Sequence, residues 1–97
     1  MKYRDKTELI ALILIAVSSR RNVGAVHIMY KAFLSYIQMK KYVSILIAAG
    51  LIKYQEGNLR TYRITDKGIR FLDLHNKISE LLLPSNPSSS SKTIIIR

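Results

Sequence analysis

The sequence predicts a small α+β domain, mainly helical, in which a three-helix core is followed by a short β-hairpin and a C-terminal helix. Four apolar-rich segments have the length and flanking residues of helices, and two short β-prone segments enclose a glycine-containing turn. The 97 residues allow one modest hydrophobic core and no second domain. Hydrophobic residues make up 48% of the chain, a proportion typical of a folded protein.

The first predicted helix runs from about Asp5 to Ser18. Asp5 or Thr7 can cap it, and Glu8 is favourable in the first turn because a carboxylate is attracted to the positive end of the helix dipole. Apolar side chains occur on every side of this helix, which predicts burial on every side: Leu9, Ile10, Leu12, Ile13, Leu14, Ile15 and Val17. We expect a one- or two-residue strand in the basic loop that follows, residues 20–24.

Two further helices joined by a tight turn are predicted over Ala25–Ala32 and Tyr36–Ala49. Apolar residues of the shorter helix share one face at (i, i+3, i+4) spacing: Val26, Met29 and Tyr30. Ser35 can cap the longer helix, and Gly50 directly after it suits the left-handed residue that ends many helices. The inner face of the longer helix is expected to consist of Met39, Tyr42, Val43 and Leu46.

A hairpin and a last helix complete the predicted domain. Leu51–Gln55 and Leu59–Ile64 are predicted strands around a turn at 56–58. Thr65 can cap the last helix, 66–83, which is followed by Pro and Ser residues. The order helix, helix, turn, helix, hairpin, helix is that of a winged helix-turn-helix domain, whose hairpin is called the wing.

The strongest global signal is positive charge. Sixteen Lys and Arg residues against six Asp and Glu residues give a net charge of +10. No acidic residue occurs between Leu9 and Gln55. Such a balance indicates a polyanionic partner, either nucleic acid or an anionic membrane surface. The alternative is that surplus lysine only keeps a small protein soluble, but that would not require so long a segment without a carboxylate.

Several classes of function lack the residues they need. The chain has no cysteine, its two histidines are far apart, and no phosphate-binding or zinc-protease motif occurs. We therefore expect no enzyme, no cofactor, no metal site and no small-molecule substrate. The apolar run Leu9–Val17 is too short to span a membrane, and Asp5 and Glu8 oppose a signal peptide. We expect a cytoplasmic protein associated with the nucleoid and not with a membrane.

Particular residues also resemble a known family. The segments Ile28–Ala32, Leu34–Tyr36, Gly50–Ile52 and Tyr62–Gly68, together with Tyr42, resemble small archaeal winged helix-turn-helix DNA-binding proteins, over about residues 4–80. That family includes basic chromatin-type proteins and short transcriptional regulators. The resemblance implies DNA binding through the third helix and the wing, and often a dimer built through the C-terminal helix. Two features depart from the family: the last helix stops at a proline, and no hydrophobic anchor follows it.

The third helix is the predicted reading element, because the second helix of a helix-turn-helix enters the major groove. Gln38 is the best candidate for reading bases, since a carboxamide pairs bidentately with adenine. Ser35 and Tyr36 suit phosphate or base contacts, Lys40 and Lys41 suit phosphates, and Ser44 shares their outward face. The alternatives are a solvated helix face and, for Tyr36, packing against the edge of the core.

The wing and the second helix supply further candidates. Asn58 and Arg60 at the tip of the wing, and Arg63 further along, can reach the minor groove or its phosphates. The alternative is an ordinary turn with a solvated arginine. Lys31 at the end of the second helix can hold the DNA backbone beside the third helix.

The last helix and the first helix together predict a homodimer, because a chain of this size has no room to cover a first helix that is apolar all round. Phe71, Leu74, Ile78 and Leu81 recur at 3-4-3 spacing, as in a coiled-coil seam, and a second apolar strip lies beside them. One strip can pack on the chain's own core and the other then needs a partner, although both could be buried within one subunit. We expect residues 1–83 to form the DNA-binding domain, with 66–83 as its dimerisation helix. Residues 84–97 are expected to be a flexible Ser/Pro-rich tail that includes the β-prone run Thr93–Ile96.

These observations predict binding of double-stranded DNA, with the protein acting as a transcriptional regulator. One alternative is an architectural chromatin-type protein of low sequence specificity. Another is a winged helix that binds a protein partner, in which case the charge is incidental. Salt dependence distinguishes the last alternative, because neutralising phosphates gives a steep loss of affinity with added salt.

Overall fold

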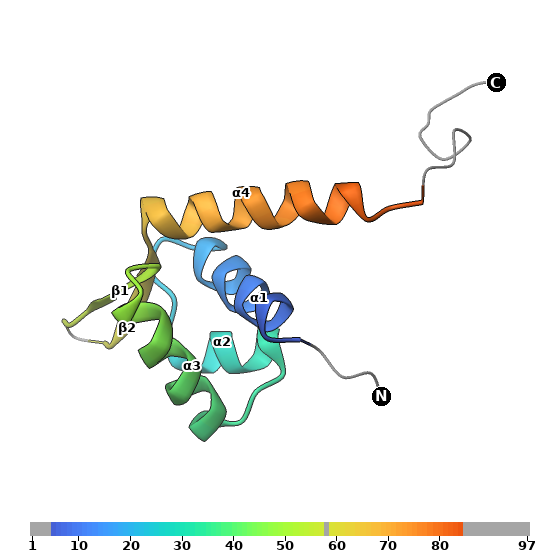
Figure 1. Ribbon diagram of the computed structural model, residues 1–97. Helices are drawn as coiled ribbons and strands as arrows, with labels where there is room; N and C mark the ends of the chain where they lie inside the picture. The colour runs from blue at the N-terminus through green and yellow to red at the C-terminus, as the bar shows by residue number, and fades with distance from the viewer. Residues whose placement is uncertain (1–4, 58, 85–97) are drawn as a thin grey trace.

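The computed structural model describes residues 5–57 and 59–84. Its elements follow the predicted order (Figure 1): α1 (Lys6–Ser18), α2 (Ala25–Ala32), α3 (Tyr36–Ala48), β1 (Ile52–Gln55), β2 (Thr61–Ile64) and α4 (Asp66–Leu81). The mainly helical α+β architecture with a two-stranded antiparallel hairpin is therefore confirmed. Asn58 and the predicted run Thr93–Ile96 lie outside the described residues.

Polar side chains at three helix starts explain why these helices begin where they do. Asp5, and not Thr7, caps α1 by accepting a hydrogen bond from the Glu8 backbone N–H at 2.8 Å. Ser35 caps α3, and Thr65 caps α4 by accepting from the Gly68 N–H at 3.0 Å. Each cap satisfies a backbone donor that the helix itself leaves without a partner.

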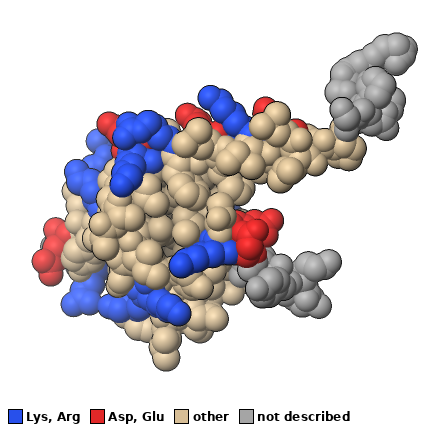
Figure 2. Space-filling view, viewed as in Figure 1, with Lys and Arg blue, Asp and Glu red and all other residues tan. Residues whose placement is uncertain are grey.

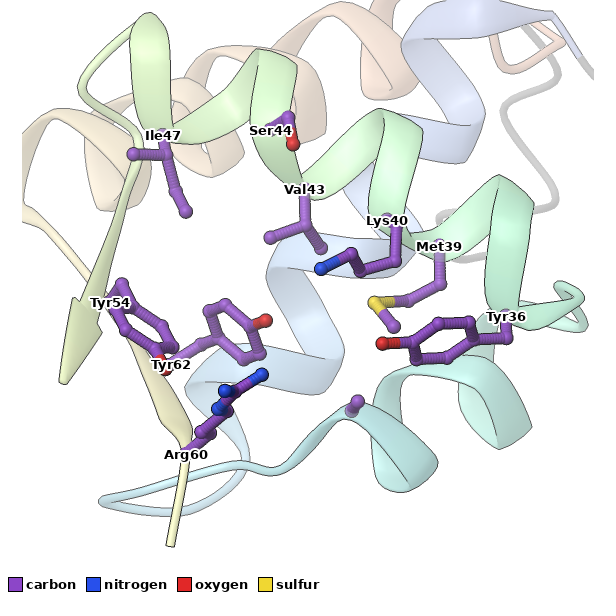
Figure 3. Close-up of a pocket in the computed structure, with 10 residues that line it drawn as sticks. Tyr36, Met39, Lys40, Val43, Ser44, Ile47, Tyr54, Arg60 and Tyr62 are labelled. Atoms are coloured by element: carbon purple, nitrogen blue, oxygen red, sulfur yellow. The ribbon is translucent and has the colours of Figure 1, made fainter. Parts of the chain in front are cut away.

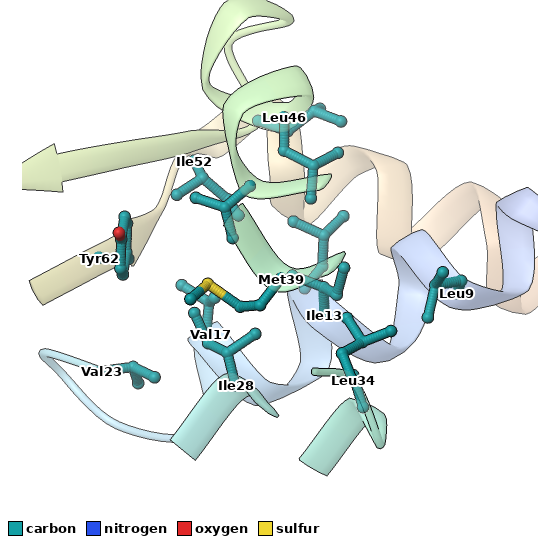
Figure 4. Packing of buried hydrophobic residues seen from close by; sticks show 14 residues of the cluster. Leu9, Ile13, Val17, Val23, Ile28, Leu34, Met39, Leu46, Ile52 and Tyr62 are labelled. Carbon is teal, nitrogen blue, oxygen red and sulfur yellow. The ribbon is translucent and has the colours of Figure 1, made fainter. Parts of the chain in front are cut away.

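The core lies between α1, α2, α3 and the hairpin (Figure 4). Side chains from all four parts are fully or almost fully buried there, among them Ile13, Leu14, Ile28, Met39, Leu46 and Ile52. The prediction that α1 is buried on every side is wrong. Ile15 is 52% exposed, and Ile10 and Leu12 are only partly covered. The reason is that α1 packs mainly against α2, α4 and β2, which leaves one strip of the helix facing solvent.

The inner face of α2 also differs from the prediction. Val26 and Tyr30 are 77% and 75% exposed, whereas Ile28 and Ala32 are fully buried. In this eight-residue helix both sets of residues have helical spacing, so the sequence alone could not decide which face packs on α1. An exposed apolar and aromatic face therefore accompanies α2 on the surface.

The two hairpin strands pair in one register, and one additional bridge attaches the hairpin to the loop after α1. Tyr54 pairs with Tyr62, and Ile52 pairs with Ile64. Val23 exchanges two backbone hydrogen bonds with Tyr62, of 2.8 and 3.1 Å. This bridge confirms the short strand predicted in the basic loop and ties the loop to the base of the wing.

The turn between α2 and α3 contains a strained residue. Phe33 has a φ of 57°, in the left-handed region that is unfavourable for residues with a side chain, and its ring is 79% exposed. Since the ring buries little surface, Phe33→Gly should raise the free energy of unfolding by about 1 kcal/mol. Urea denaturation measures this change. Phe33→Ala, which keeps the Cβ, should give no comparable gain, and a loss in the glycine variant would contradict the prediction.

Candidate nucleic-acid interface

The outward face of α3 carries the polar residues that the sequence assigned to it. Met39, Val43 and Leu46 are buried, as predicted. Tyr42, also predicted on the inner face, is half-buried against the core. The polar residues predicted to face outward are all exposed: Ser35, Tyr36, Gln38, Lys40, Lys41 and Ser44. Ile37, which is 80% exposed, belongs to the same face.

Gln38 has a structural role that the sequence analysis missed. The Ser35 backbone N–H donates to Gln38 Oε1 at 3.0 Å, and the Gln38 N–H donates to Ser35 Oγ at 3.2 Å. These reciprocal bonds form a capping box, which the Ser-x-x-Gln spacing could have revealed. Bidentate pairing with adenine uses both the oxygen and the nitrogen of the carboxamide. The oxygen keeps a second lone pair, but the cap holds the carboxamide against the Ser35 backbone and so competes with bidentate pairing to adenine.

Arg60 and Arg63 lie on opposite faces of the wing. Arg63 is opposite Lys53 in the register, while Tyr62 beside it points to the other face and toward the core. Arg60, directly before β2, lines a surface depression together with Tyr62 and the α3 residue Lys40, and therefore faces α3. The structure therefore brings Arg60 together with the α3 residues and places Arg63 away from them.

A depression of about 230 Å³ lies between α3 and the wing (Figure 3). It joins four of the predicted residues, namely Tyr36, Lys40, Ser44 and Arg60. The remaining lining residues are Ala25, Met39, Val43, Ile47, Tyr54 and Tyr62. The sequence analysis did not place Tyr54 and Tyr62 in the site. Pairing of the two predicted strands, which sets these tyrosines opposite each other, could have indicated them.

Cationic side chains lie beside aromatic rings in this depression. Lys40 Nζ lies 5.8 Å from the centre of the Tyr36 ring, within range of a cation–π interaction. The rings of Tyr54 and Tyr62 are 5.5 Å apart and tilted by 52°. Burial, followed by the neighbouring Tyr54, raises the pKa of the Tyr62 hydroxyl above its ordinary value, so this ring stays neutral.

Lys31 and Lys41 do not line the depression. Lys41 Nζ lies 5.8 Å from the Tyr42 ring, and Lys31 is exposed near the end of α2.

A second hollow, of about 630 Å³, lies between the start of α2 and the hairpin and brings Arg20 and Arg60 together with Tyr30. At its edge His27 hydrogen-bonds Ser19 Oγ at 3.1 Å. Partial burial, together with Arg20 and Lys31, lowers the pKa of His27 below its ordinary value.

The charge on this side of the molecule is almost entirely positive. Between residues 19 and 65 the chain carries one acidic residue, Glu56, and eight basic ones: Arg20, Arg21, Lys31, Lys40, Lys41, Lys53, Arg60 and Arg63. On the face shown in Figure 2, Lys and Arg extend along the side of the wing and α3. The other five carboxylates occur at the start of α1 and on α4. The result is a positive surface centred on α3 and the wing.

The predicted dimer residues occupy a different surface. Leu74, Ile78 and Leu81 are 60%, 57% and 83% exposed, whereas Phe71 is partly buried against the core. An apolar hollow of about 420 Å³ lies between the start of α1 and α4 and includes Leu74 and Ile78.

Within the described residues, no helix has the length and hydropathy needed to cross a membrane.

Comparisons with known proteins identify related folds. A family model described as winged helix-turn-helix matches residues 3–83. The chain has no significant match among curated protein sequences. The structure is similar to that of Sso10a-2, a DNA-binding protein from Sulfolobus solfataricus, with a TM-score of 0.64 and 25% identity over 84% of this chain and 100% of that chain. These findings confirm the resemblance suggested by the sequence motifs.

Two longer regulators share the fold. The transcriptional regulator BldR from Sulfolobus solfataricus gives a TM-score of 0.62 at 23% identity, over 84% of this chain and 64% of that chain. A MarR family transcriptional regulator from Silicibacter pomeroyi gives 0.63 at 13% identity, over 78% of this chain and 55% of that chain. The present chain thus matches less than two thirds of the length of either regulator.

Proposed function

The chain belongs to the winged helix-turn-helix family, and from this premise we propose that it binds double-stranded DNA through α3 and the wing and acts as a transcriptional regulator. The observation that carries the proposal is the positive surface, in which exposed residues of α3 and the wing face outward together with no carboxylate on α3. The DNA-binding protein Sso10a-2, similar along its whole length, supports the same partner. A protein with this partner works at the nucleoid, in the cytoplasm.

In this proposal α3 occupies the major groove. The helix has 13 residues and is therefore about 20 Å long, enough to follow the groove for several base pairs. Tyr36 and Gln38, near its N-terminus, are closest to base edges in the usual docking geometry. Lys40 and Lys41, one turn further on, contact phosphates, and Arg60 of the wing contacts the backbone beside the same groove.

Lys40→Ala and Lys41→Ala should each weaken binding to all duplex sequences to a similar degree. Because each lysine neutralises about one phosphate, each substitution should reduce the slope of log affinity against log salt by about one. Fluorescence anisotropy at several salt concentrations measures this slope. Lys77→Ala on α4 is the matched control, since it removes the same charge from an exposed position away from α3. Equal slopes for all three variants would contradict the proposed interface.

An architectural role with low sequence specificity is the second candidate, and the capping box favours it. Gln38→Ala distinguishes the two functions. If Gln38 reads a base, the substitution should lower the ratio of specific to non-specific affinity by about 5- to 150-fold. If Gln38 only caps α3, the ratio should stay constant while stability falls by about 1 kcal/mol. Binding to selected and random duplexes, combined with thermal melting, separates these results.

We also infer that two copies of the chain pair through α4. Only Gly68 of this 16-residue helix is buried, and the C-terminal half of α4 extends beyond the body of the domain (Figure 1). A helix of this length is marginal in water without packing partners. Leu74, Ile78 and Leu81 lie on its exposed surface at the spacing of a coiled-coil seam. Covering them with a second copy would stabilise α4 and present two α3 helices to one duplex.

A further inference from the structure

Three aromatic rings, those of Tyr36, Tyr54 and Tyr62, line the depression between α3 and the wing. Figure 3 shows the Tyr36 ring on one side of it and the rings of Tyr54 and Tyr62 on the other. Tyr36 and Tyr54 are 52% and 39% exposed, so parts of both rings remain accessible, whereas Tyr62 is 8% exposed and forms the rear wall. The buried side chains of Met39 and Val43 supply an apolar floor.

Cations reach this aromatic surface from both elements. Lys40 extends from α3 and Arg60 from the hairpin, and both line the depression together with the rings (Figure 3). No Asp or Glu is among the described residues that line it. A ligand that complements this surface has a flat apolar face and carries negative charge close to that face.

Duplex DNA offers only half of this chemistry. Its phosphates are accessible, but its bases are stacked on each other and present only their edges in the grooves. An unpaired nucleotide offers both the face of the base and the phosphate. The exposed tyrosines would gain stacking contacts from an unpaired base that they cannot gain from a paired one.

We propose that this depression binds an unpaired base of single-stranded nucleic acid. The base stacks on the accessible rings of Tyr36 or Tyr54, and Lys40 and Arg60 hold the phosphates on either side of it. This activity goes beyond the proposed binding of double-stranded DNA. Because both ligands use Lys40 and Arg60, duplex and single strand should compete for the same face of the protein.

The first experiment asks whether bases contribute to binding. Fluorescence anisotropy is measured with oligothymidylate of about 16 nucleotides, an abasic strand of equal length and charge, oligouridylate of the same length, and a DNA duplex. The wild-type chain should bind oligothymidylate at least about tenfold more tightly than the abasic strand, because only the former can stack. Equal affinities for these two strands would overturn the proposal. Comparison of oligothymidylate with oligouridylate identifies DNA or RNA as the preferred source of the base.

The second experiment locates the stacking site. Tyr36→Leu and Tyr54→Leu keep an apolar side chain but remove the ring, and each should weaken oligothymidylate binding by about 5- to 150-fold if its ring stacks a base. Tyr54→Phe, which keeps the ring, should bind as the wild type does. Phe33→Leu is the matched control, because it removes an exposed aromatic ring that lines neither this depression nor the second hollow.

The outcomes separate this proposal from the proposed function. At least one of the two leucine variants should lose much more single-strand affinity than duplex affinity, since the duplex does not stack on the rings. Tyr54→Leu should change duplex affinity by less than about twofold, because Tyr54 is not among the proposed duplex contacts, whereas Tyr36→Leu also removes a proposed base-edge contact. If both variants lose single-strand and duplex affinity equally, or lose neither, the proposal is wrong. If Tyr54→Leu fails to show a cooperative thermal transition, Tyr36→Leu decides the result. Tyrosine-dependent single-strand binding without any duplex binding would contradict the proposed function and leave this inference intact.

Discussion

Replacing Ile78 with glutamate should convert the protein in solution from a particle of about twice 11.1 kDa to one of 11.1 kDa. Ile78 is 57% exposed near the middle of the apolar surface of α4, with Leu74 and Leu81 one turn away on either side. A charge buried in the proposed coiled-coil seam without a partner opposes association strongly. Light scattering at micromolar concentration measures the mass of both proteins.

The same substitution should weaken binding to a duplex with two half-sites by about 10²- to 10⁴-fold, because the second α3 is then no longer tethered to the first. The winged-helix core should still unfold cooperatively, since Ile78 lies outside that core. Phe71 is unsuitable for this test, because it packs partly against the chain's own core. Asn76→Glu, which adds a charge at an exposed position outside the seam, should leave the mass unchanged. A wild-type mass of 11.1 kDa would contradict the dimer.

Gly68→Ala should destabilise the fold by about 1 to 3 kcal/mol, even though alanine is the better helix former by about 1 kcal/mol. A Cβ at this position would overlap the Leu51 carbonyl oxygen and lie 2.7 Å from Ile64 Cγ1. The neighbouring backbone has little room to move, because Thr65 N–H donates to that same Leu51 oxygen at 3.1 Å. Gly68 thus allows α4 to start in close contact with the base of the wing.

This prediction is measured by thermal unfolding. For a domain of this size the expected loss corresponds to a fall in melting temperature of about 5 to 20 °C. Gly57→Ala is the control, because a Cβ at Gly57 would meet no atom within 4 Å and should change the melting temperature little. An unchanged or higher melting temperature for Gly68→Ala would show that the junction can relax around a methyl group.

The junction at Gly68 also connects α3 to the rest of the fold. Thr65 Oγ1 donates to the Gly50 carbonyl at 2.6 Å, and Lys67 Nζ donates to the Ala49 carbonyl at 2.7 Å. Both bonds satisfy carbonyls at the C-terminal end of α3, where a cation is also favoured by the helix dipole. The start of α4 therefore helps to fix the orientation of α3, which carries most of the proposed DNA contacts.

The amino-acid sequence by itself determined the number and order of the elements and where the helices begin, whereas the return strand starts at Thr61 instead of Leu59 and the last helix ends at Leu81 instead of residue 83. The caps Asp5, Ser35 and Thr65 act on backbone groups three residues away, so their effect can be inferred without knowing the fold. Gly50 has the predicted left-handed conformation, with a φ of 82°, because the end of a helix is also a local event. The outward face of α3 followed from periodicity, since Met39, Val43 and Leu46, which are buried, recur on one side of the helix.

Only the tertiary structure decided which surfaces meet. Spacing relates side chains within one element, but burial of a face depends on the element that packs against it, and that contact is distant in sequence. For this reason Ile28 and not Tyr30 is the inner residue of α2, and Ile15 of α1 is exposed. The same long-range packing places Arg60 and Tyr54 of the hairpin opposite Tyr36 and Lys40 of α3. The aromatic and basic depression therefore exists only because the wing folds back onto α3.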